Sequence, residues 1–230
     1  MTAARDDDEP APSADMVARL HATLDDVPAL AGPREVEALT GGLTNVNFKV
    51  TTPERTVVVR LSGSDGDLLS IDRDAEHVNS RRAAESGAAP EVLRYLPEHH
   101  ALIIAWIQGR TLVADELRET PMLERVAAVC RTLHAGPRFV GDFDMFAVQR
   151  RYLGIVQERG FRLPDRYLEL MPQADRIAAA LAVRKGPTVS CNNDLLAANF
   201  IDDGQRLWVI DYEYGGNGDP AFELGNIWQE

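Results

Sequence analysis

The hydrophobic pattern of this chain changes its period once, and that change constrains the fold more than any other feature. Between residues 36 and 107, short β-prone runs alternate with turn signals, as they do in antiparallel strands. Beyond residue 112, apolar residues recur at helical spacing instead. The sequence therefore predicts an α+β fold in which an antiparallel β lobe precedes a mainly helical lobe.

The first lobe is predicted to contain two helices and a sheet of about five strands. One helix is expected from Ser13 to the Gly32-Pro33 break, and another from Asp72 to Ser86. The expected strands cover residues 36–40, 46–51, 56–61, 92–96 and 101–107. We assign residues 1–12 to a disordered acidic tail, 13–108 to the N-terminal nucleotide-binding lobe and 109–230 to an incomplete C-terminal catalytic lobe.

The second lobe is predicted to contain three helices before short strands return. They are expected at residues 120–134, 146–159 and 165–184. The predicted buried stripe of the first comprises Leu123, Val126, Ala127, Cys130 and Leu133. The predicted core positions of the third are Leu168, Met171, Ile177, Ala178 and Leu181.

Composition bounds the partners and the compartment. The 230 residues are 45% hydrophobic and 26% charged, which is ordinary for a soluble globular protein. A net charge of −12 argues against nucleic acid or an anionic membrane as the main partner and suits a small cationic substrate. Two cysteines without metal-ligand spacing, and no signal-like or membrane-spanning run, favour a reduced cytoplasmic compartment without membrane insertion.

The chemistry of the chain is concentrated in residues 187–226. Asp194 and Asn199 flank a tight loop there, and Asp211 closes an apolar run. The Asp203-Gly204 signal predicts a hairpin that brings these three polar side chains together. Phosphoryl transfer needs one aspartate that orients a hydroxyl, and an Asn and a second Asp that hold Mg²⁺ on the phosphates.

A simpler interpretation has to be weighed against this one. The spacing D-x-x-x-x-N occurs by chance in many chains, and an Asp after a strand is often only a turn residue. The hairpin context and the D-P-A-F-E-L-G-N tail at residues 219–226 favour the catalytic interpretation.

At these residues the sequence resembles the choline/ethanolamine kinase and aminoglycoside phosphotransferase families. Their H-N-D-x-x-x-x-N loop appears as Asn192-Asn193-Asp194 with Asn199, and their I-D-[FWY]-E-Y segment as Ile210 to Tyr214. The resemblance implies a protein-kinase-like two-lobed fold and a kinase that uses ATP and Mg²⁺. Asp194, Asn199 and Asp211 are then the catalytic residues, and Asn199 and Asp211 also bind the metal.

The resemblance also implies a nucleotide site in the first lobe. The turn that contains Gly41, Gly42, Thr44 and Asn45 would lie over the phosphates. Arg60 would hold phosphates, with Glu76 as its ion-pair partner. The backbone at Trp106 and Ile107 would meet adenine. An ordinary hairpin, an edge cation and a surface glutamate are the alternatives for these elements.

The acceptor is expected to be a small, choline-like alcohol. Glu213 and Tyr214 follow the choline/ethanolamine version of the motif, and with Glu230 they are the predicted substrate-binding residues. Aromatic faces and carboxylates suit a quaternary ammonium, so Tyr212, Trp228 and Glu223 are further candidates for half of a cage. Aminoglycosides and thiamine are the alternative acceptors.

Two departures from the family pattern keep a different class of function open. Asn192 stands where the loop normally has His, and relatives continue through further helices after the segment that ends at Glu230. The family histidine chiefly supports the loop backbone, so an active kinase remains the leading hypothesis. A nucleotide-binding pseudokinase or a truncated regulatory remnant is the alternative.

Overall fold

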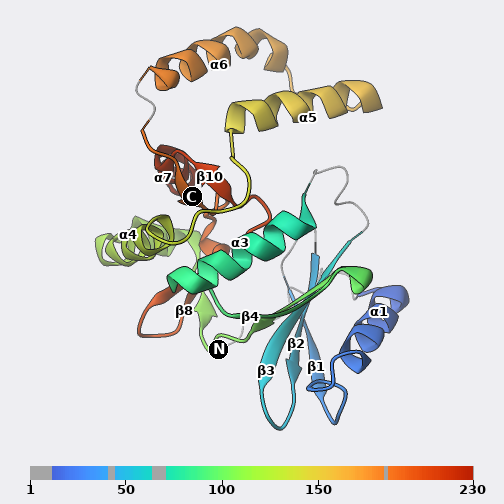
Figure 1. Ribbon diagram of the computed structural model, residues 1–230. Helices are drawn as coiled ribbons and strands as arrows, with labels where there is room; N and C mark the ends of the chain where they lie inside the picture. Colours follow the sequence, from blue (N-terminus) through green and yellow to red (C-terminus); the bar gives the residue numbers. More distant parts are fainter. Residues whose placement is uncertain (1–11, 41–44, 64–70, 184–185, 230) are drawn as a thin grey trace.

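The computed structural model describes residues 12–40, 45–63, 71–183 and 186–229 (Figure 1). Residues 1–11 of the predicted tail lie outside this range. So do four predicted site residues, namely Gly41, Gly42, Thr44 and Glu230.

The N-terminal part is built on the predicted five-stranded antiparallel sheet, in the order β1-β2-β3-β5-β4. The strands are β1 (Glu35–Leu39), β2 (Asn45–Thr51), β3 (Thr56–Ser62), β4 (Val92–Leu96) and β5 (Ala101–Ala105). In the central strand β3, Val57, Val59 and Leu61 point into one core. Because side chains alternate along a strand, Arg60 points to the opposite face.

Two helices lie beside the sheet. Helix α1 (Ala14–Asp25) is capped by Ser13 and buries Leu20 and Leu24 against the valines of β3. Helix α3 (Arg73–Ser86) begins at the N-cap Asp72 and ends at Gly87, whose φ of 86° suits glycine. In Figure 1, α3 lies between the sheet and the C-terminal elements, so it can contact both.

The chain leaves the sheet at Trp106 and enters two small sheets. In one, β6 (Arg110–Thr111) pairs with β8 (Phe200–Asp202), which pairs with β9 (Leu207–Val209); in the other, β7 (Val189–Cys191) pairs with β10 (Gly216–Gly218). A Cβ at Gly109 would lie 2.5 Å from the carbonyl oxygen of Asp202, so only glycine fits where β6 approaches β8.

The helices of the C-terminal part differ in how they are covered. They are α4 (Thr120–His134), α5 (Met145–Arg159), α6 (Tyr167–Ala182) and α7 (Pro220–Trp228). Within the described residues, 3₁₀ turns cover Pro97–His99 of the N-terminal part, and Ala114–Arg118 and Ala197–Asn199 of the C-terminal part. Val126, Cys130 and Leu133 of α4 join Leu195, Phe200 and Val209 in a second core.

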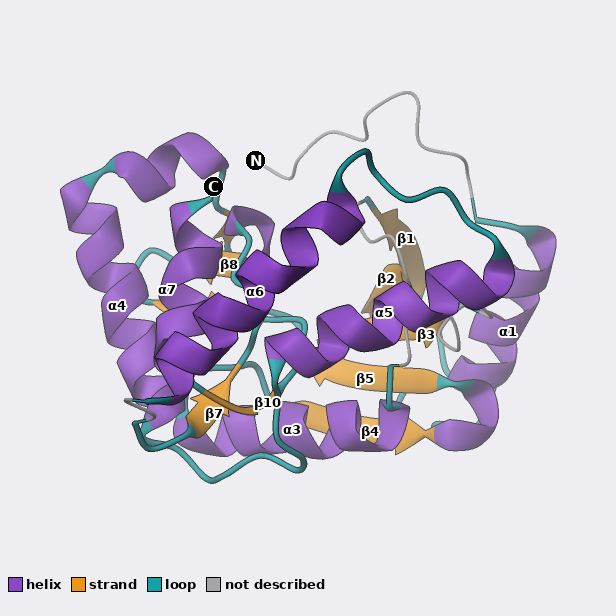
Figure 2. Ribbon diagram, turned by 90° about the horizontal axis from the view of Figure 1, so that it is seen from above, coloured by secondary structure: helices purple, strands orange, loops and turns teal. Residues whose placement is uncertain are grey.

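Some of the predicted core positions are wrong. Leu123 of α4 is exposed, and in α6 none of the described residues is buried: Leu168, Ile177 and Leu181 are each about half exposed, and Met171 and Ala178 are half-buried. Figures 1 and 2 show α5 and α6 together in a layer apart from the sheet. Helical periodicity identifies an apolar face but not whether another element covers it.

No helix in the described part of the chain combines the length and the apolar character needed to cross a bilayer.

Candidate active site

The loop between β7 and β8 presents the first predicted catalytic residue. The side-chain amide of Asn199 donates to the backbone oxygen of Asp194 at 2.8 Å and to its carboxylate Oδ2 at 3.2 Å. The backbone amide of Leu195 donates to the Asn226 side chain from α7. Asp194 and Asn199 are both half-buried, so their side chains can reach solvent and a ligand.

A buried glutamate on α7 holds the backbone of this loop. Oε1 of Glu223, on α7, accepts the backbone amides of Asn192 at 2.6 Å and Asn193 at 3.1 Å. Its other oxygen pairs with the ring of His134 at the end of α4. Because both of its oxygens are engaged, Glu223 fixes the backbone of the loop, and His134 has a structural partner. Cys191, which lies within reach of both, is fully buried, and burial raises the pKa of its thiol.

Asn192 connects the loop to the hairpin. Its side-chain nitrogen donates to the backbone oxygens of Ile210 at 3.2 Å and Asp211 at 2.7 Å, and its oxygen accepts the backbone amide of Asp194 at 2.9 Å. Asn192 is fully buried. The residue that replaces the family histidine therefore links the backbones of the two predicted catalytic aspartates.

The hairpin brings Asp211 to the site. The backbone amide of Ile210 donates to the backbone oxygen of Asn199 at 3.0 Å, which holds the end of β9 next to the loop. Asp211 has a φ of 64°, in the left-handed region that is costly for an aspartate. The contact between its backbone oxygen and Asn192 helps to hold this conformation. Its side chain is 30% exposed.

Arg60 of the N-terminal sheet meets these C-terminal residues. Its Nη2 lies 2.6 Å from Oδ1 of Asp211, and its Nη1 lies 3.0 Å from Oε1 of Glu76 on α3, so the predicted Arg60–Glu76 ion pair is present. Burial alone would lower the pKa of Arg60, but Asp211, Glu76 and Glu213 outweigh it and raise that pKa. The guanidinium is therefore a permanent charge between the two lobes.

Glu213 points to the N-terminal lobe. Its Oε1 lies 2.8 Å from Nη2 of Arg60 and 3.0 Å from Nη1 of Arg73, and it also accepts a hydrogen bond from Asn45 at the start of β2. Arg73 lies 2.7 Å from Glu76 as well. Sequence reasoning missed Arg73. Its spacing of three residues from Glu76 on one helix was the available signal.

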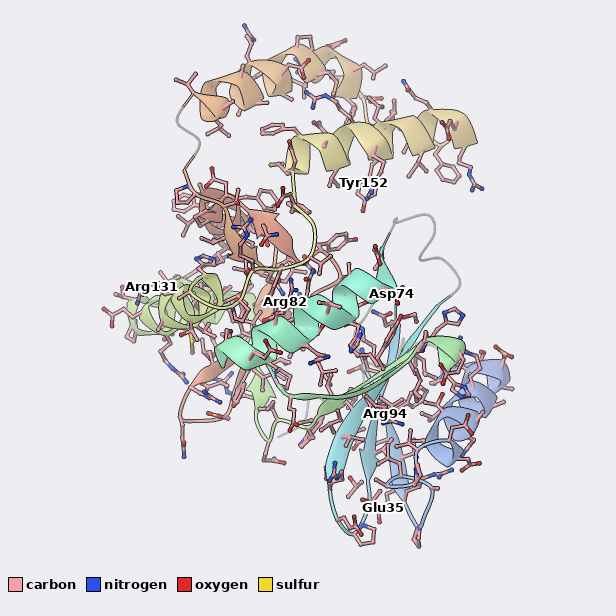
Figure 3. The ribbon with its side chains drawn as sticks, viewed as in Figure 1. Glu35, Asp74, Arg82, Arg94, Arg131 and Tyr152 are labelled. Atoms are coloured by element: carbon pink, nitrogen blue, oxygen red, sulfur yellow. The ribbon has the colours of Figure 1, made fainter. Side chains whose placement is uncertain are left out.

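The predicted adenine and acceptor residues are partly open. Trp106 and Ile107 are half-buried, and Lys49 lies 4.9 Å above the Trp106 ring. Tyr214 is half-buried, and burial together with a hydrogen bond to Tyr152 raises its pKa. Figure 3 shows Tyr152 below α5, on the side that faces the rest of the molecule.

Two residues considered for the ammonium cage do not fit that role. Tyr212 is 3% exposed and belongs to the second core, and Glu223 is 2% exposed beneath the loop. Trp228 is 91% exposed at the end of α7. These side chains are close in sequence, but Tyr212 and Glu223 lie in the interior and Trp228 lies on the surface, so they do not line one pocket.

The site has suitable groups for a magnesium ion and for phosphates. Carboxylate oxygens of Glu76, Asp211 and Glu213 lie within 4.8 Å of one another, and oxygen ligands are those that Mg²⁺ prefers. Glu76 and Glu213 are each paired with two guanidiniums and are 4% and 5% exposed, whereas Asp211 is paired with one and is 30% exposed. Asp211 and the side-chain oxygen of Asn199 are therefore the better candidates for metal ligands. Among the described residues, Nε of Arg60 and Nη2 of Arg73 are buried donors without a hydrogen-bond acceptor, and guanidiniums form strong hydrogen bonds to phosphate oxygens.

Comparison with known proteins gives consistent matches. The model of the family described as choline/ethanolamine kinase matches residues 36–230. Ethanolamine kinase 1 of Mus musculus is 28% identical over 218 residues, which cover 86% of this chain and 59% of that protein. The first three curated relatives are covered over 47% to 59% of their length, so this chain spans about half of them.

Solved structures are similar as well. A choline/ethanolamine kinase family protein from Mesorhizobium loti has a TM-score of 0.76 and 31% identity, with 91% of this chain and 69% of that chain covered. The structure of LicA in complex with AMP has a TM-score of 0.72 and 24% identity, and the match covers 91% of this chain and 73% of that chain. At this identity the match establishes a shared fold. Together they confirm the predicted protein-kinase-like α+β fold.

Proposed function

Because the chain belongs to the choline/ethanolamine kinase family, we propose that it transfers a phosphoryl group from ATP to the hydroxyl of a small cationic alcohol such as choline or ethanolamine. The observation that carries this proposal is the 2.6 Å contact between Arg60 and Asp211. It brings a cation suited to phosphates next to a carboxylate suited to Mg²⁺, on a hairpin that is hydrogen-bonded to the Asp194 loop.

The nucleotide would lie between the lobes. Arg60 holds its phosphates, and Glu76 keeps Arg60 in place. The predicted turn with Gly41, Gly42, Thr44 and Asn45 would cover the phosphates, and the backbone of Trp106 and Ile107 would meet adenine. The similar structure of LicA with AMP supports nucleotide binding by this fold.

The reacting hydroxyl would be oriented by Asp194, whose carboxylate is held by the Asn199 amide and whose backbone is held by Asn192. Asn199 and Asp211 bind Mg²⁺, which when bound neutralises the phosphate oxygens of ATP. Because Asp211 and Asp194 are joined through the single side chain of Asn192, the metal ligand and the residue that accepts the proton keep a fixed spacing.

The acceptor would be held by aromatic and acidic groups near Asp194. Tyr214 can present its ring to an ammonium group, and the partly exposed Tyr152 lies against it. Of the two predicted carboxylates, Glu230 is proposed for this pocket, because the Glu213 side chain is 5% exposed and already paired with Arg60 and Arg73. The net charge of −12 also favours a cationic substrate.

Phosphoryl transfer to a panel of alcohols tests the proposal. We expect transfer from Mg·ATP to choline or ethanolamine in preference to thiamine and aminoglycosides. Asp194→Asn should lower turnover by at least about 10²-fold while leaving ATP affinity within about threefold. Asp175→Asn, in an exposed ion pair on α6, is the matched control. Mg·ATP binding without transfer to any alcohol would favour the pseudokinase.

A further inference from the structure

Four side chains close a ring of ion pairs between the lobes. Nη1 of Arg60 lies 3.0 Å from Glu76, which lies 2.7 Å from Arg73. Arg73 lies 3.0 Å from Glu213, which returns to Nη2 of Arg60 at 2.8 Å. Two guanidiniums and two carboxylates alternate around it, so the ring is neutral. We call these four residues the charge ring.

Asp211 is attached to the charge ring but is not part of it. It contacts Nη2 of Arg60 at 2.6 Å, and its side chain is 30% exposed, whereas the ring side chains are between 4% and 17% exposed. If Asp211 turns toward a cation, Arg60 still has Glu76 and Glu213 as partners. The ring therefore separates the task of holding Arg60 from the task of binding the metal.

We propose that Arg73 is a positioning residue of the nucleotide site, because it completes the charge ring and leaves Asp211 as the carboxylate of this cluster that takes the metal. This inference rests on the proposed function. Arg73 shares one nitrogen, Nη1, between Glu76 on its own helix and Glu213 on the other lobe. It is the second cation that the three neighbouring carboxylates require.

Charge arithmetic shows why a second cation matters here. The cluster of Arg60, Arg73, Glu76, Glu213 and Asp211 has two positive and three negative charges, which leaves one negative charge for a divalent cation to neutralise. Without Arg73 it has two net negative charges around the same Arg60. Such a cluster attracts a divalent cation more strongly and repels a polyphosphate more strongly.

A purely structural role for Arg73 makes a different prediction. Helix α3 is also fixed to the C-terminal lobe by buried Asn79, which donates to the backbone oxygen of Gly215 at 2.8 Å and accepts the amide of Val140 at 2.7 Å. Loss of Arg73 therefore leaves α3 anchored. If Arg73 only tied the lobes together, its loss would weaken metal and nucleotide binding alike.

Binding measurements on Arg73→Met separate these roles. The two quantities are the Mg²⁺ affinity of the nucleotide-free protein and the affinity for ATP at saturating Mg²⁺, both by titration calorimetry. We expect ATP binding to weaken by at least about fivefold and Mg²⁺ binding to tighten by at least about threefold. The double variant Arg73→Met/Glu213→Gln removes one charge of each sign and should return Mg²⁺ affinity to within about twofold of wild type.

Two further variants serve as controls. Arg81→Met removes the same charge from α3 at a side chain that is 59% exposed and 3.9 Å from Glu85, and it should change neither affinity. Arg73→Lys keeps the charge and should keep wild-type Mg²⁺ affinity, so it also serves if Arg73→Met does not fold. Thermal unfolding of each variant reports folding independently.

The outcomes distinguish this inference from the proposed function. Opposite shifts of Mg²⁺ and ATP affinity in Arg73→Met support the charge ring. Parallel weakening of both affinities in Arg73→Met, or no change in either, overturns it. Tightened Mg²⁺ binding in Arg73→Lys also overturns it. A wild-type protein that binds no ATP at all contradicts the proposed function itself, whatever the variants do.

Discussion

The carboxylate of Glu223 offers a direct test of how the Asp194 loop is held. It is 2% exposed, it accepts the backbone amides of Asn192 and Asn193 at 2.6 and 3.1 Å, and it pairs with His134. Glu223→Ala would leave two buried amides and one half-buried imidazole without this partner. Glu223→Gln would keep an oxygen for the amides but remove the charge.

The expected losses follow from these contacts. Leaving a buried donor without its acceptor costs about 1–3 kcal/mol, and more where the acceptor was charged, so the loss of two amide contacts should cost about 3–5 kcal/mol. Losing only the charge from hydrogen bonds worth about 1.5–3 kcal/mol each should cost less, about 1–2 kcal/mol. We therefore expect the unfolding free energy to fall by about 3–5 kcal/mol in Glu223→Ala and by about 1–2 kcal/mol in Glu223→Gln.

Urea denaturation measures both values, and hydrogen exchange of the amides of residues 192 and 193 shows whether the loop itself opens. Asp175→Asn is the control: its ion pair with Arg150 is 2.5 Å long but more than half exposed on both sides, so it should cost less than about 1 kcal/mol. If Glu223→Ala cost no more than this control, the loop would be held by its other contacts and the reasoning would be wrong.

Three other changes test the site. Asp211→Asn should weaken ATP binding with Mg²⁺ by at least about tenfold in calorimetry and change it little without Mg²⁺; equal effects under both conditions would show a turn residue. Asn192→His should not raise turnover by more than about tenfold, because one imidazole cannot replace all three hydrogen bonds of the amide; steady-state kinetics that show a far larger gain would mark a disabled enzyme. The hydrogen bonds from Arg125, which lies 2.6 Å away, lower the pKa of Asp202 below its ordinary value of 3.8, so this pair stabilises the protein at higher pH and stops doing so as the pH falls through the lowered pKa. Asp202→Asn should therefore make the unfolding free energy depend less on pH below about pH 5. An unchanged pH dependence in this variant would contradict the prediction.

The sequence predicted those parts of the fold and site that depend on local pattern. Each expected strand of the five-stranded sheet is present, and the Asp203-Gly204 signal corresponds to a turn in which Gly204 has a φ of 87°. The Arg60–Glu76 pair was also predictable, because the resemblance to the kinase families implies a cation on this strand and an acidic partner on the following helix. The roles assigned to these residues in binding and catalysis remain predictions.

What the sequence could not reveal depends on which surfaces meet. The apolar face of α6 reads like a core helix, yet Leu168 and Ile177 are about half exposed because no described element covers them. Glu223 and Tyr212 lie within a motif rich in acceptor candidates, and only the packing of α7 and α4 shows that both are buried. Periodicity and spacing place a side chain on a face, whereas burial depends on the distant partner.

Burial also sorts the carboxylates of the site by task. Glu223, Glu76 and Glu213 have side chains that are 2% to 5% exposed, and each is paired with a cation or with His134. A buried charge requires such pairing, so these three maintain the frame. Asp211 and Asp194 are more open and can exchange their partners for a ligand. It follows that substitutions of the glutamates should lower the unfolding free energy together with activity, whereas substitutions of the two aspartates should lower activity while the unfolding free energy stays nearly constant.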